Sequence, residues 1–141
     1  GSHMGTFTYE RQVYLADTDG AGVVYFNQFL QMCHEAYESW LSSEHLSLQN
    51  IISVGDFALP LVHASIDFFA PAHCGDRLLV NLTITQASAH RFCCDYEISQ
   101  AESAQLLARA QTHHVCIALP ERKKAPLPQP WQTAICDLDH P

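Results

Sequence analysis

Apolar and polar positions follow several distinct periods along this chain, and each period predicts one kind of element. Alternation with many β-forming residues predicts a strand over residues 7–15. Beyond a short turn, apolar residues recur at intervals of three and four, which is typical of one amphipathic helix without internal Gly or Pro. Its apolar stripe consists of Phe29, Met32, Cys33, Ala36, Tyr37, Trp40 and Leu41.

The second half of the chain is predicted to be mostly strands. Apolar residues there alternate with polar ones, and short polar stretches separate the alternating runs. Pro71 is expected to end the first of these runs. By this pattern, strands are expected over residues 63–70, 78–88, 91–100 and 106–119.

Two stretches follow neither period. Residues 50–62 have a mixed pattern, with a turn expected near Gly55 and Asp56. The tail over residues 126–141 is proline-rich at first and is expected to be extended.

The order of elements is strand, long helix, strand and then three strands with short links. One helix can cover one face of a five-stranded antiparallel sheet if the sheet curls around it. The pattern therefore predicts an α+β domain with its helix on one side. The uncovered face and the sheet edges favour oligomerisation. Residues 1–4, GSHM, have the form of an expression-tag remnant, so residues 5–141 are expected to form the single domain.

Composition excludes several classes of function. The formal charge is -8, from 15 acidic and 7 basic residues, which does not suit a nucleic-acid binder. No apolar run approaches the roughly 18 residues that a membrane span requires. The six cysteines contain no C-x-x-C pair, which favours reduced thiols in a cytoplasmic protein.

The stretch ADTDGAGVVYFNQF, residues 16–29, carries the candidate chemistry. Asp17 and Asp19 precede Gly20 and Gly22, directly before the helix. Glycines allow positive φ and close approach of a ligand, and unpaired N–H groups at a helix start can polarise a carbonyl oxygen. A nearby carboxylate can attack that carbonyl or activate water. The same residues also suit an ordinary turn and helix cap, so spacing alone leaves both interpretations open.

DTDGAGVVYFNQFLQMCHEAYESWL resembles the 4-hydroxybenzoyl-CoA thioesterase branch of the hotdog-fold thioesterases, which carries D-x-D-x-x-G-[VI]-V-[YF]-[YF] at this place. The resemblance extends from about Phe7 to Trp131 and includes IDFFAPAHCGDRL. HEAYESWL is similar to cyanobacterial and plant-type enzymes that hydrolyse 1,4-dihydroxy-2-naphthoyl-CoA in phylloquinone (vitamin K1) synthesis. The resemblance implies a hotdog fold, in which a curved antiparallel sheet wraps around one long helix.

The resemblance also implies roles for residues of the motif. Asp19 is expected to be catalytic, as nucleophile or as general base. The backbone N–H of Phe26, with Tyr25 beside it, is expected to polarise the thioester carbonyl. Gly22 would permit the close approach, while Asp17 would be a structural member of the turn. The implied activity is hydrolysis of an aromatic acyl-CoA without a metal or a separate cofactor, because CoA is part of the substrate.

Further residues are expected to bind the substrate. Family members bind the CoA phosphates with basic residues near the central hairpin and after the last strand, often from a neighbouring subunit; the matching residues here are Arg91, Arg122, Lys123 and Lys124. His63 could line a polar wall of the acyl pocket, although a structural histidine is the simpler interpretation. The family forms dimers with active sites at the interface, and dimers commonly pair into tetramers.

Several alternatives stay open. Glu35 lies on the long helix, where a different hotdog branch has its catalytic glutamate. A dehydratase needs a histidine at the turn, and His34 lies too far inside the helix. The substrate could be another thioester, such as 4-hydroxybenzoyl-CoA or a fatty acyl-CoA, or the chain could bind acyl-CoA without catalysis. His113 and His114 are adjacent in a strand, so their side chains diverge and cannot form a metal pair with each other.

Overall fold

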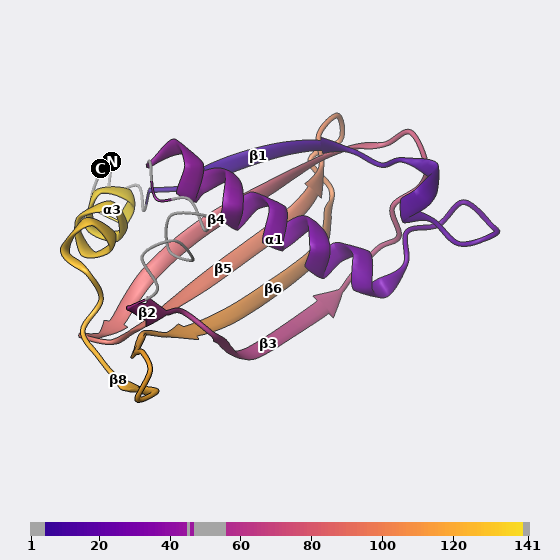
Figure 1. Cartoon of the computed structure of the whole chain (residues 1–141). Helices are drawn as coiled ribbons and strands as arrows, with labels where there is room; N and C mark the ends of the chain where they lie inside the picture. Colours follow the sequence, from indigo (N-terminus) through magenta and orange to yellow (C-terminus); the bar gives the residue numbers. More distant parts are fainter. Residues whose placement is uncertain (1–4, 45, 47–55, 140–141) are drawn as a thin grey trace.

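In the computed structural model, helix α1 (Phe26–Ser43) lies against one face of a curved antiparallel sheet (Figure 1). The strands of this sheet are β1 (Phe7–Gln12), β3 (Leu61–Phe68), β4 (Arg77–Ser88), β5 (Arg91–Gln100) and β6 (Leu106–Val115). Their order across the sheet is β1-β4-β5-β6-β3. This architecture confirms the predicted α+β hotdog fold.

The structure describes residues 5–44, 46 and 56–139. The tag remnant and Gly55 of the expected turn lie outside the described residues. Short strands β2 (Phe57–Ala58), β7 (Ile117–Ala118) and β8 (Lys123–Lys124) form a second, small sheet. The strand expected over residues 106–119 is therefore divided between β6 and β7. It breaks at Cys116, whose N–H donates to the carbonyl of His90 at 2.8 Å instead of continuing the pairing.

The core lies between α1 and the concave face of the sheet. Every residue of the predicted apolar stripe of α1 is buried. Opposite the helix, alternate residues of β4 are at most 1 % exposed, namely Leu78, Val80, Leu82 and Ile84. Burying an aliphatic side chain of this size contributes roughly 1.5–3 kcal/mol. Period and burial agree because each apolar side chain of the stripe meets the same sheet face.

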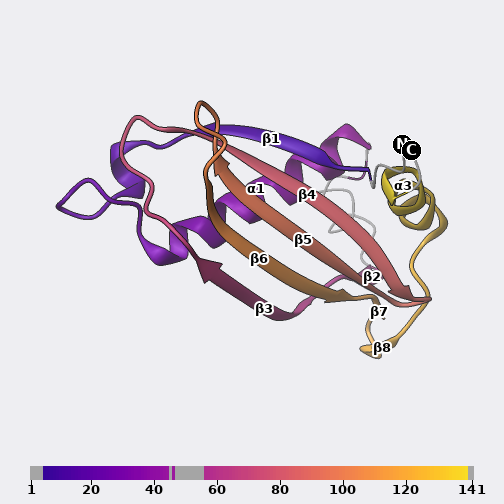
Figure 2. The same cartoon turned by 180° about the vertical axis from the view of Figure 1, so that it is seen from behind.

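Strand β3 forms one edge of the sheet (Figure 2). Among the described residues it pairs only with β6, so no described strand lies on its other side. Apolar side chains are exposed at its start, where Leu61 is 47 % exposed and Val62 is 51 % exposed. This edge can accept another strand.

The extended tail that we expected is wrong for its second half. Residues Gln129–Asp139 form helix α3, which packs against β4 near the end of the sheet (Figure 1). Pro130 lies in the first turn, where a missing N–H costs no hydrogen bond, and no proline or glycine follows it within the helix. An apolar stripe then recurs at helical spacing and is largely buried: Trp131, Ala134, Ile135 and Leu138.

The described helices include none long and apolar enough to cross a membrane. All six cysteines are free. Burial raises the pKa of the Cys33 and Cys94 thiols to about 12, so these two stay protonated and unreactive near neutral pH.

Candidate active site

The two aspartates of the motif lie in a hydrogen-bonded loop between β1 and α1, here called the aspartate loop (residues 17–25). Thr18 forms an antiparallel bridge with Val24 across it. Inside this bridge the N–H of Asp19 donates to the carbonyl of Val23 at 2.8 Å, and the N–H of Gly22 donates to the carbonyl of Asp19 at 3.1 Å. Gly22 has φ +79°, a conformation that favours glycine, so the geometry of the turn explains why glycine stands at this position.

The carboxylate of Asp19 is held by one of its two oxygens. Its Oδ1 accepts hydrogen bonds from the N–H groups of Ala21 at 2.8 Å and Val23 at 3.2 Å. No group of the described residues donates to Oδ2. The side chain is partly buried, so its orientation is fixed while one oxygen stays available to a ligand.

Helix α1 begins directly after this loop. Tyr25 is its N-cap residue, and the N–H of Tyr25 donates to the carbonyl of Asp17 at 3.1 Å. No side chain caps the helix, and its first turn, which starts at Phe26, contains no acidic residue. No side chain therefore occupies the N–H groups at the helix start, and the positive end of the helix dipole favours negative charge there. The loop that contains Asp19 thus leads directly into the helix start at Phe26.

A second segment contacts the aspartate loop, and the sequence analysis did not foresee it. The N–H of Val24 donates to the carbonyl of Ala72 at 2.9 Å, and the N–H of Cys74 donates to the carbonyl of Gly22 at 3.1 Å. Val23 also forms a bridge with His73. The loop between β3 and β4 therefore holds the aspartate loop by backbone hydrogen bonds. Only the family motif IDFFAPAHCGDRL, which covers this loop, pointed to it.

An open apolar cavity of about 400 Å³ adjoins the aspartate loop. Its lining consists of Val23, Val24, Phe29, Phe68, Phe69, Ala70 and Pro71. Phe29 and Phe68 meet edge to face, with ring centroids 5.1 Å apart. An apolar wall with aromatic rings suits a flat hydrocarbon group. Tyr25 does not line this cavity and is 48 % exposed.

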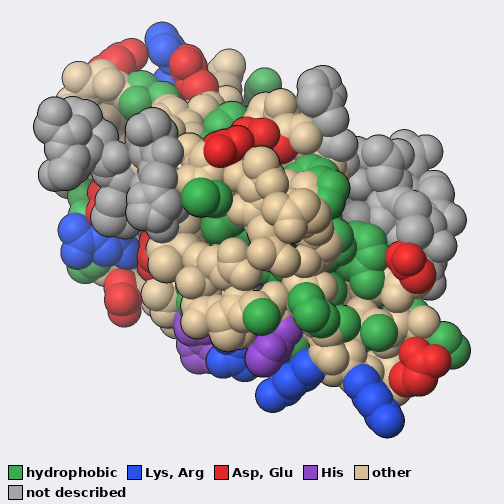
Figure 3. Space-filling view, turned by 90° about the vertical axis from the view of Figure 1, so that its left-hand side faces the viewer, with side chains coloured by type: hydrophobic (Ala, Val, Ile, Leu, Met, Phe, Trp, Pro, Cys, Tyr) green, Lys and Arg blue, Asp and Glu red, His purple; other side chains and the backbone are tan. Residues whose placement is uncertain are grey.

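The basic residues predicted to bind phosphates lie at the other end of the sheet. Arg91 begins β5, Arg122 precedes β8, and Lys123 and Lys124 form β8; all four are exposed. Figure 3 looks onto this end of the molecule, where Lys and Arg side chains gather at the lower edge. β4 runs between the two ends over 12 residues, or roughly 35 Å. The structure does not bring these cations to the aspartate loop of the same chain.

His63 also lies apart from the aspartate loop. It is cross-strand partner to His113, and their rings meet edge to face with centroids 5.1 Å apart. His114, the next residue, is buried, whereas His113 is only partly buried and lies within 3.4 Å of the Cys93 sulfur. The side chains of His113 and His114 therefore diverge as predicted. His63 belongs to the outer face of the sheet, away from α1.

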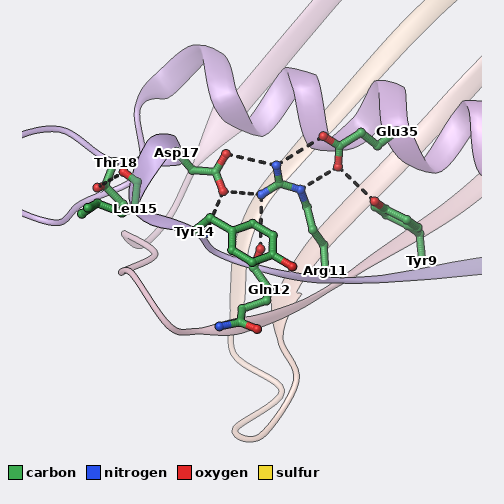
Figure 4. A network of polar contacts seen from close by, with 8 residues as sticks. All are labelled: Tyr9, Arg11, Gln12, Tyr14, Leu15, Asp17, Thr18 and Glu35. Carbon is green, nitrogen blue, oxygen red and sulfur yellow. Dashed lines mark hydrogen bonds and ion pairs between the residues drawn. The ribbon is translucent and has the colours of Figure 1, made fainter.

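Two other carboxylates near the aspartate loop, Asp17 and Glu35, belong to one ion-pair network (Figure 4). Asp17 is 5 % exposed and forms two hydrogen bonds with the guanidinium of Arg11. The Arg11 guanidinium holds the pKa of the Asp17 carboxyl below its ordinary value. Glu35, the alternative catalytic carboxylate, also binds Arg11. This supports the structural interpretation of Asp17. Of Asp17, Asp19 and Glu35, only Asp19 has a carboxylate oxygen that accepts no hydrogen bond from a described residue.

A curved antiparallel sheet around one helix, with a carboxylate loop at the start of that helix, defines the thioesterase class of hotdog proteins. The chain belongs to the Thioesterase-like superfamily, which it matches over residues 13–135.

Curated relatives are similar over most of their length. The chain is 46% identical over 121 residues to the 1,4-dihydroxy-2-naphthoyl-CoA hydrolase of Microcystis aeruginosa, covering 86% of each chain. It is 42% identical over 130 residues to the protein of the same name from Synechococcus elongatus, covering 92% of this chain and 94% of that one. Its fold also matches the solved DHNA-CoA thioesterase of Staphylococcus aureus, with a TM-score of 0.82 at 21% identity over 94% of this chain and 89% of that one.

Proposed function

We propose that this protein is an acyl-CoA thioesterase that hydrolyses 1,4-dihydroxy-2-naphthoyl-CoA to 1,4-dihydroxy-2-naphthoate and CoA, the reaction of phylloquinone synthesis. One observation carries the proposal. Asp19, whose Oδ2 accepts no hydrogen bond from a described residue, lies in a loop that leads into an uncapped helix start and lines an apolar cavity. The names of the curated relatives support the naphthoyl substrate. The aromatic lining of the cavity is compatible with a fused two-ring acyl group.

The geometry supports a direct mechanism. The thioester carbonyl oxygen accepts the N–H of Phe26, so negative charge that develops on it is stabilised at the helix start. Oδ2 of Asp19 then attacks the carbonyl carbon, the carbon–sulfur bond breaks, and CoA leaves as a thiolate; water hydrolyses the resulting anhydride. Alternatively, Asp19 removes a proton from water, which attacks the same carbon. Single-turnover reactions in ¹⁸O-labelled water test the first route: attack of water on the aspartyl carbon of the anhydride leaves the aspartate oxygen in an unlabelled product, whereas the general-base route always labels the product. An unlabelled product therefore identifies the anhydride.

The active form is proposed to be a homodimer, which can pair further into a tetramer. β3 has a free edge with exposed apolar side chains. The Phe68 end of β3 lies at the aspartate loop, because both line the apolar cavity. The Leu61 end lies near β7 and β8, because the carbonyl of Pro60 accepts the N–H of Val115, which shortly precedes β7. Antiparallel pairing of two β3 edges about a two-fold axis would therefore place the basic residues of one chain beside the aspartate loop of the other. The partner subunit would then supply the basic residues that bind the phosphates of CoA.

Thiol release from a panel of acyl-CoAs tests the function. Naphthoyl, benzoyl and fatty acyl thioesters should be compared, with 1,4-dihydroxy-2-naphthoyl-CoA expected to give the highest kcat/KM. Asp19→Asn removes the anionic oxygen and should lower kcat by about 100-fold or more. Glu102→Gln, in an exposed turn between β5 and β6, is the matched control and should leave kcat unchanged. Tight binding of every thioester without thiol release would instead identify a non-catalytic binding module.

We also propose that the protein acts in the cytoplasm. All six of its cysteines are free, and reduced thiols persist in that compartment.

A further inference from the structure

The guanidinium of Arg11 uses every N–H group it has. Nη1 and Nη2 donate to the two carboxylate oxygens of Asp17 at 2.5 and 3.0 Å. Nε and Nη2 donate to the two carboxylate oxygens of Glu35 at 2.6 and 3.3 Å. Nη1 also donates to the carbonyl of Gln12 at 3.3 Å. One side chain from β1 therefore forms ion pairs with both the aspartate loop and α1 (Figure 4).

Asp17, which Arg11 holds, forms hydrogen bonds at both ends of the aspartate loop. The Asp17 carboxylate accepts the N–H of Tyr14 at 2.9 Å, which fixes the 3-10 turn η1 (Leu15–Asp17) before the loop. The Asp17 carbonyl accepts the N–H of Tyr25 at 3.1 Å, which is the N-cap of α1. Asp19 lies between these two anchor points. Its position relative to the helix start is therefore set by Asp17.

The bond to Glu35 fixes the helix independently. Glu35 lies on the third turn of α1, and its Oε1 also accepts the hydroxyl of Tyr9 at 3.0 Å. Because Arg11 holds Glu35 and Asp17 at once, α1 cannot slide along its axis relative to the aspartate loop without breaking charged hydrogen bonds. Such bonds are the stronger ones in proteins, and the paired two-bond geometry adds directional specificity.

We propose that Arg11 is a positioning residue for the thioesterase reaction: through Asp17 and Glu35 it sets the distance between the carboxylate of Asp19 and the N–H groups at the start of α1. The inference rests on the proposed function, because it assigns the geometry of that same site. Catalysis between a carboxylate and an oxyanion-binding amide is sensitive to small displacements of either group. Arg11 makes no contact with the substrate in this role.

Burial and chemistry explain why arginine is required. The Arg11 and Asp17 side chains are 13% and 7% exposed, and that of Glu35 is 24% exposed. Two carboxylates face one cation, so removal of the guanidinium would leave two partly desolvated anions close together. Lysine would restore one positive charge but cannot make two parallel bonds to each of two carboxylates. Arg11→Lys therefore separates the charge of Arg11 from its geometry.

The decisive variants are Arg11→Lys, Arg11→Met and Glu35→Gln, each assayed for kcat, KM and thermal unfolding. Arg77→Met is the matched control, because Arg77 of β4 pairs with Glu10 of β1 at 2.6 Å while both side chains are more than half exposed. At temperatures where Arg11→Lys is folded by circular dichroism, we expect kcat to fall at least tenfold and KM to change less than threefold. Glu35→Gln should give a smaller fall in kcat, and Arg77→Met should leave kcat and KM unchanged.

If Arg11→Met fails to fold, Arg11→Lys and Glu35→Gln still decide the question. A folded Arg11→Lys variant with wild-type kcat would overturn the positioning role. So would a rise in KM with unchanged kcat, which would instead indicate a contribution to substrate binding.

A double variant separates positioning of Asp19 from a general structural effect. The residual thiol release of Asp19→Asn should not fall further when Arg11→Lys is added, because the group that Arg11 positions is already lost. An equal fold-loss in both backgrounds would contradict the inference. Near wild-type turnover of Asp19→Asn would contradict the proposed catalytic role of Asp19 itself. A low kcat in Asp19→Asn together with an unchanged kcat in Arg11→Lys would contradict only the role of Arg11.

Discussion

The imidazole of His114 lies parallel to the ring of Phe92, with ring centroids 4.8 Å apart and planes inclined by 5°. His114 also stacks against Tyr37, at 5.0 Å between centroids, and its Nε2 lies 3.0 Å from the hydroxyl of Thr112. The side chain is buried between α1 and the sheet. Burial, reinforced by the nearby His34, lowers the pKa of His114 from 6.5 to about 4, so the ring is neutral in the folded protein at neutral pH.

This relationship predicts acid sensitivity. Below pH 6.5 the unfolded chain binds a proton at His114 that the folded chain does not bind until about pH 4. The contribution of the neutral His114 to the free energy of unfolding is therefore fully present above pH 6.5. It is lost as the pH falls toward 4, which lowers the free energy of unfolding by about 2 to 3 kcal/mol. Urea unfolding between pH 7 and 4.5 measures it. The stability difference between the wild type and His114→Gln should shrink over this range, while His73→Gln, at an exposed site, should follow the wild type. A constant difference would contradict the assignment.

Much of the fold follows from local sequence because its period records the face that each element buries. The stripe of α1 and the alternation of β4 each meet a single apolar surface, so pattern and structure agree. The helix α3 shows where this reasoning failed. Prolines at 126, 128 and 130 favoured an extended tail, but the stripe that begins at Trp131 carried the opposite signal. Proline in a first helical turn is compatible with a helix, and burial of the stripe decided the outcome.

The candidate site also contains a part that local sequence predicts and a part that it does not. The placement of Asp19, Gly22 and Phe26 in one loop and helix start was predictable because one continuous stretch contains them all, while their catalytic roles stay predictions. The contacts of Val24 with Ala72, and of Arg11 with Glu35, join segments that are distant in sequence and depend on how strands and helix pack. No local pattern marks such pairs. The phosphate-binding roles of Arg122, Lys123 and Lys124 also stay predictions, since they depend on a second chain.

Removal of the Trp131 ring tests the contribution of α3. Trp131 is 2% exposed, and its ring centroid lies 6.4 Å from that of Trp40 and 6.1 Å from that of Phe92. Trp131→Ala should lower the free energy of unfolding by about 3–5 kcal/mol, because it leaves a cavity between α3 and the core. Trp131→Phe should lose clearly less. Equal stability of all three proteins in urea unfolding would show that α3 does not support the core.

Gly22 offers a test of the aspartate loop with a close control. A Cβ at Gly22 or at Gly20 would meet no atom within 4 Å, but only Gly22 has positive φ, at +79°. Gly22→Ala should therefore cost about 1 kcal/mol by backbone strain alone. Because the strain falls on the loop that orients Asp19, kcat should fall more in Gly22→Ala than in Gly20→Ala. Steady-state kinetics with thermal unfolding of both variants measures this. Matching kcat values would show that the loop tolerates the strain without moving the carboxylate.

Complementation between two inactive variants tests whether the site is shared between subunits. One chain carries Asp19→Asn and the other carries Lys123→Ala with Lys124→Ala; each alone should be impaired, the first in kcat and the second chiefly in KM for the acyl-CoA. If the basic residues serve the aspartate loop of the partner, each mixed dimer contains one site with both defects and one intact site. Co-expression with two affinity tags isolates this mixed dimer.

The purified mixed dimer should then show about half of the wild-type kcat with a wild-type KM, since one of two symmetric sites is restored. If Lys123 and Lys124 instead served the aspartate loop of their own chain, neither site would be intact. The mixed dimer would then combine one site of low kcat with one of high KM, and no population of wild-type sites would appear in the saturation curve. The KM of the lysine variant should also depend less on salt than that of the wild type, because it has lost charges that salt screens. An unchanged KM in that variant would show that Lys123 and Lys124 are solvated surface residues and do not bind the phosphates.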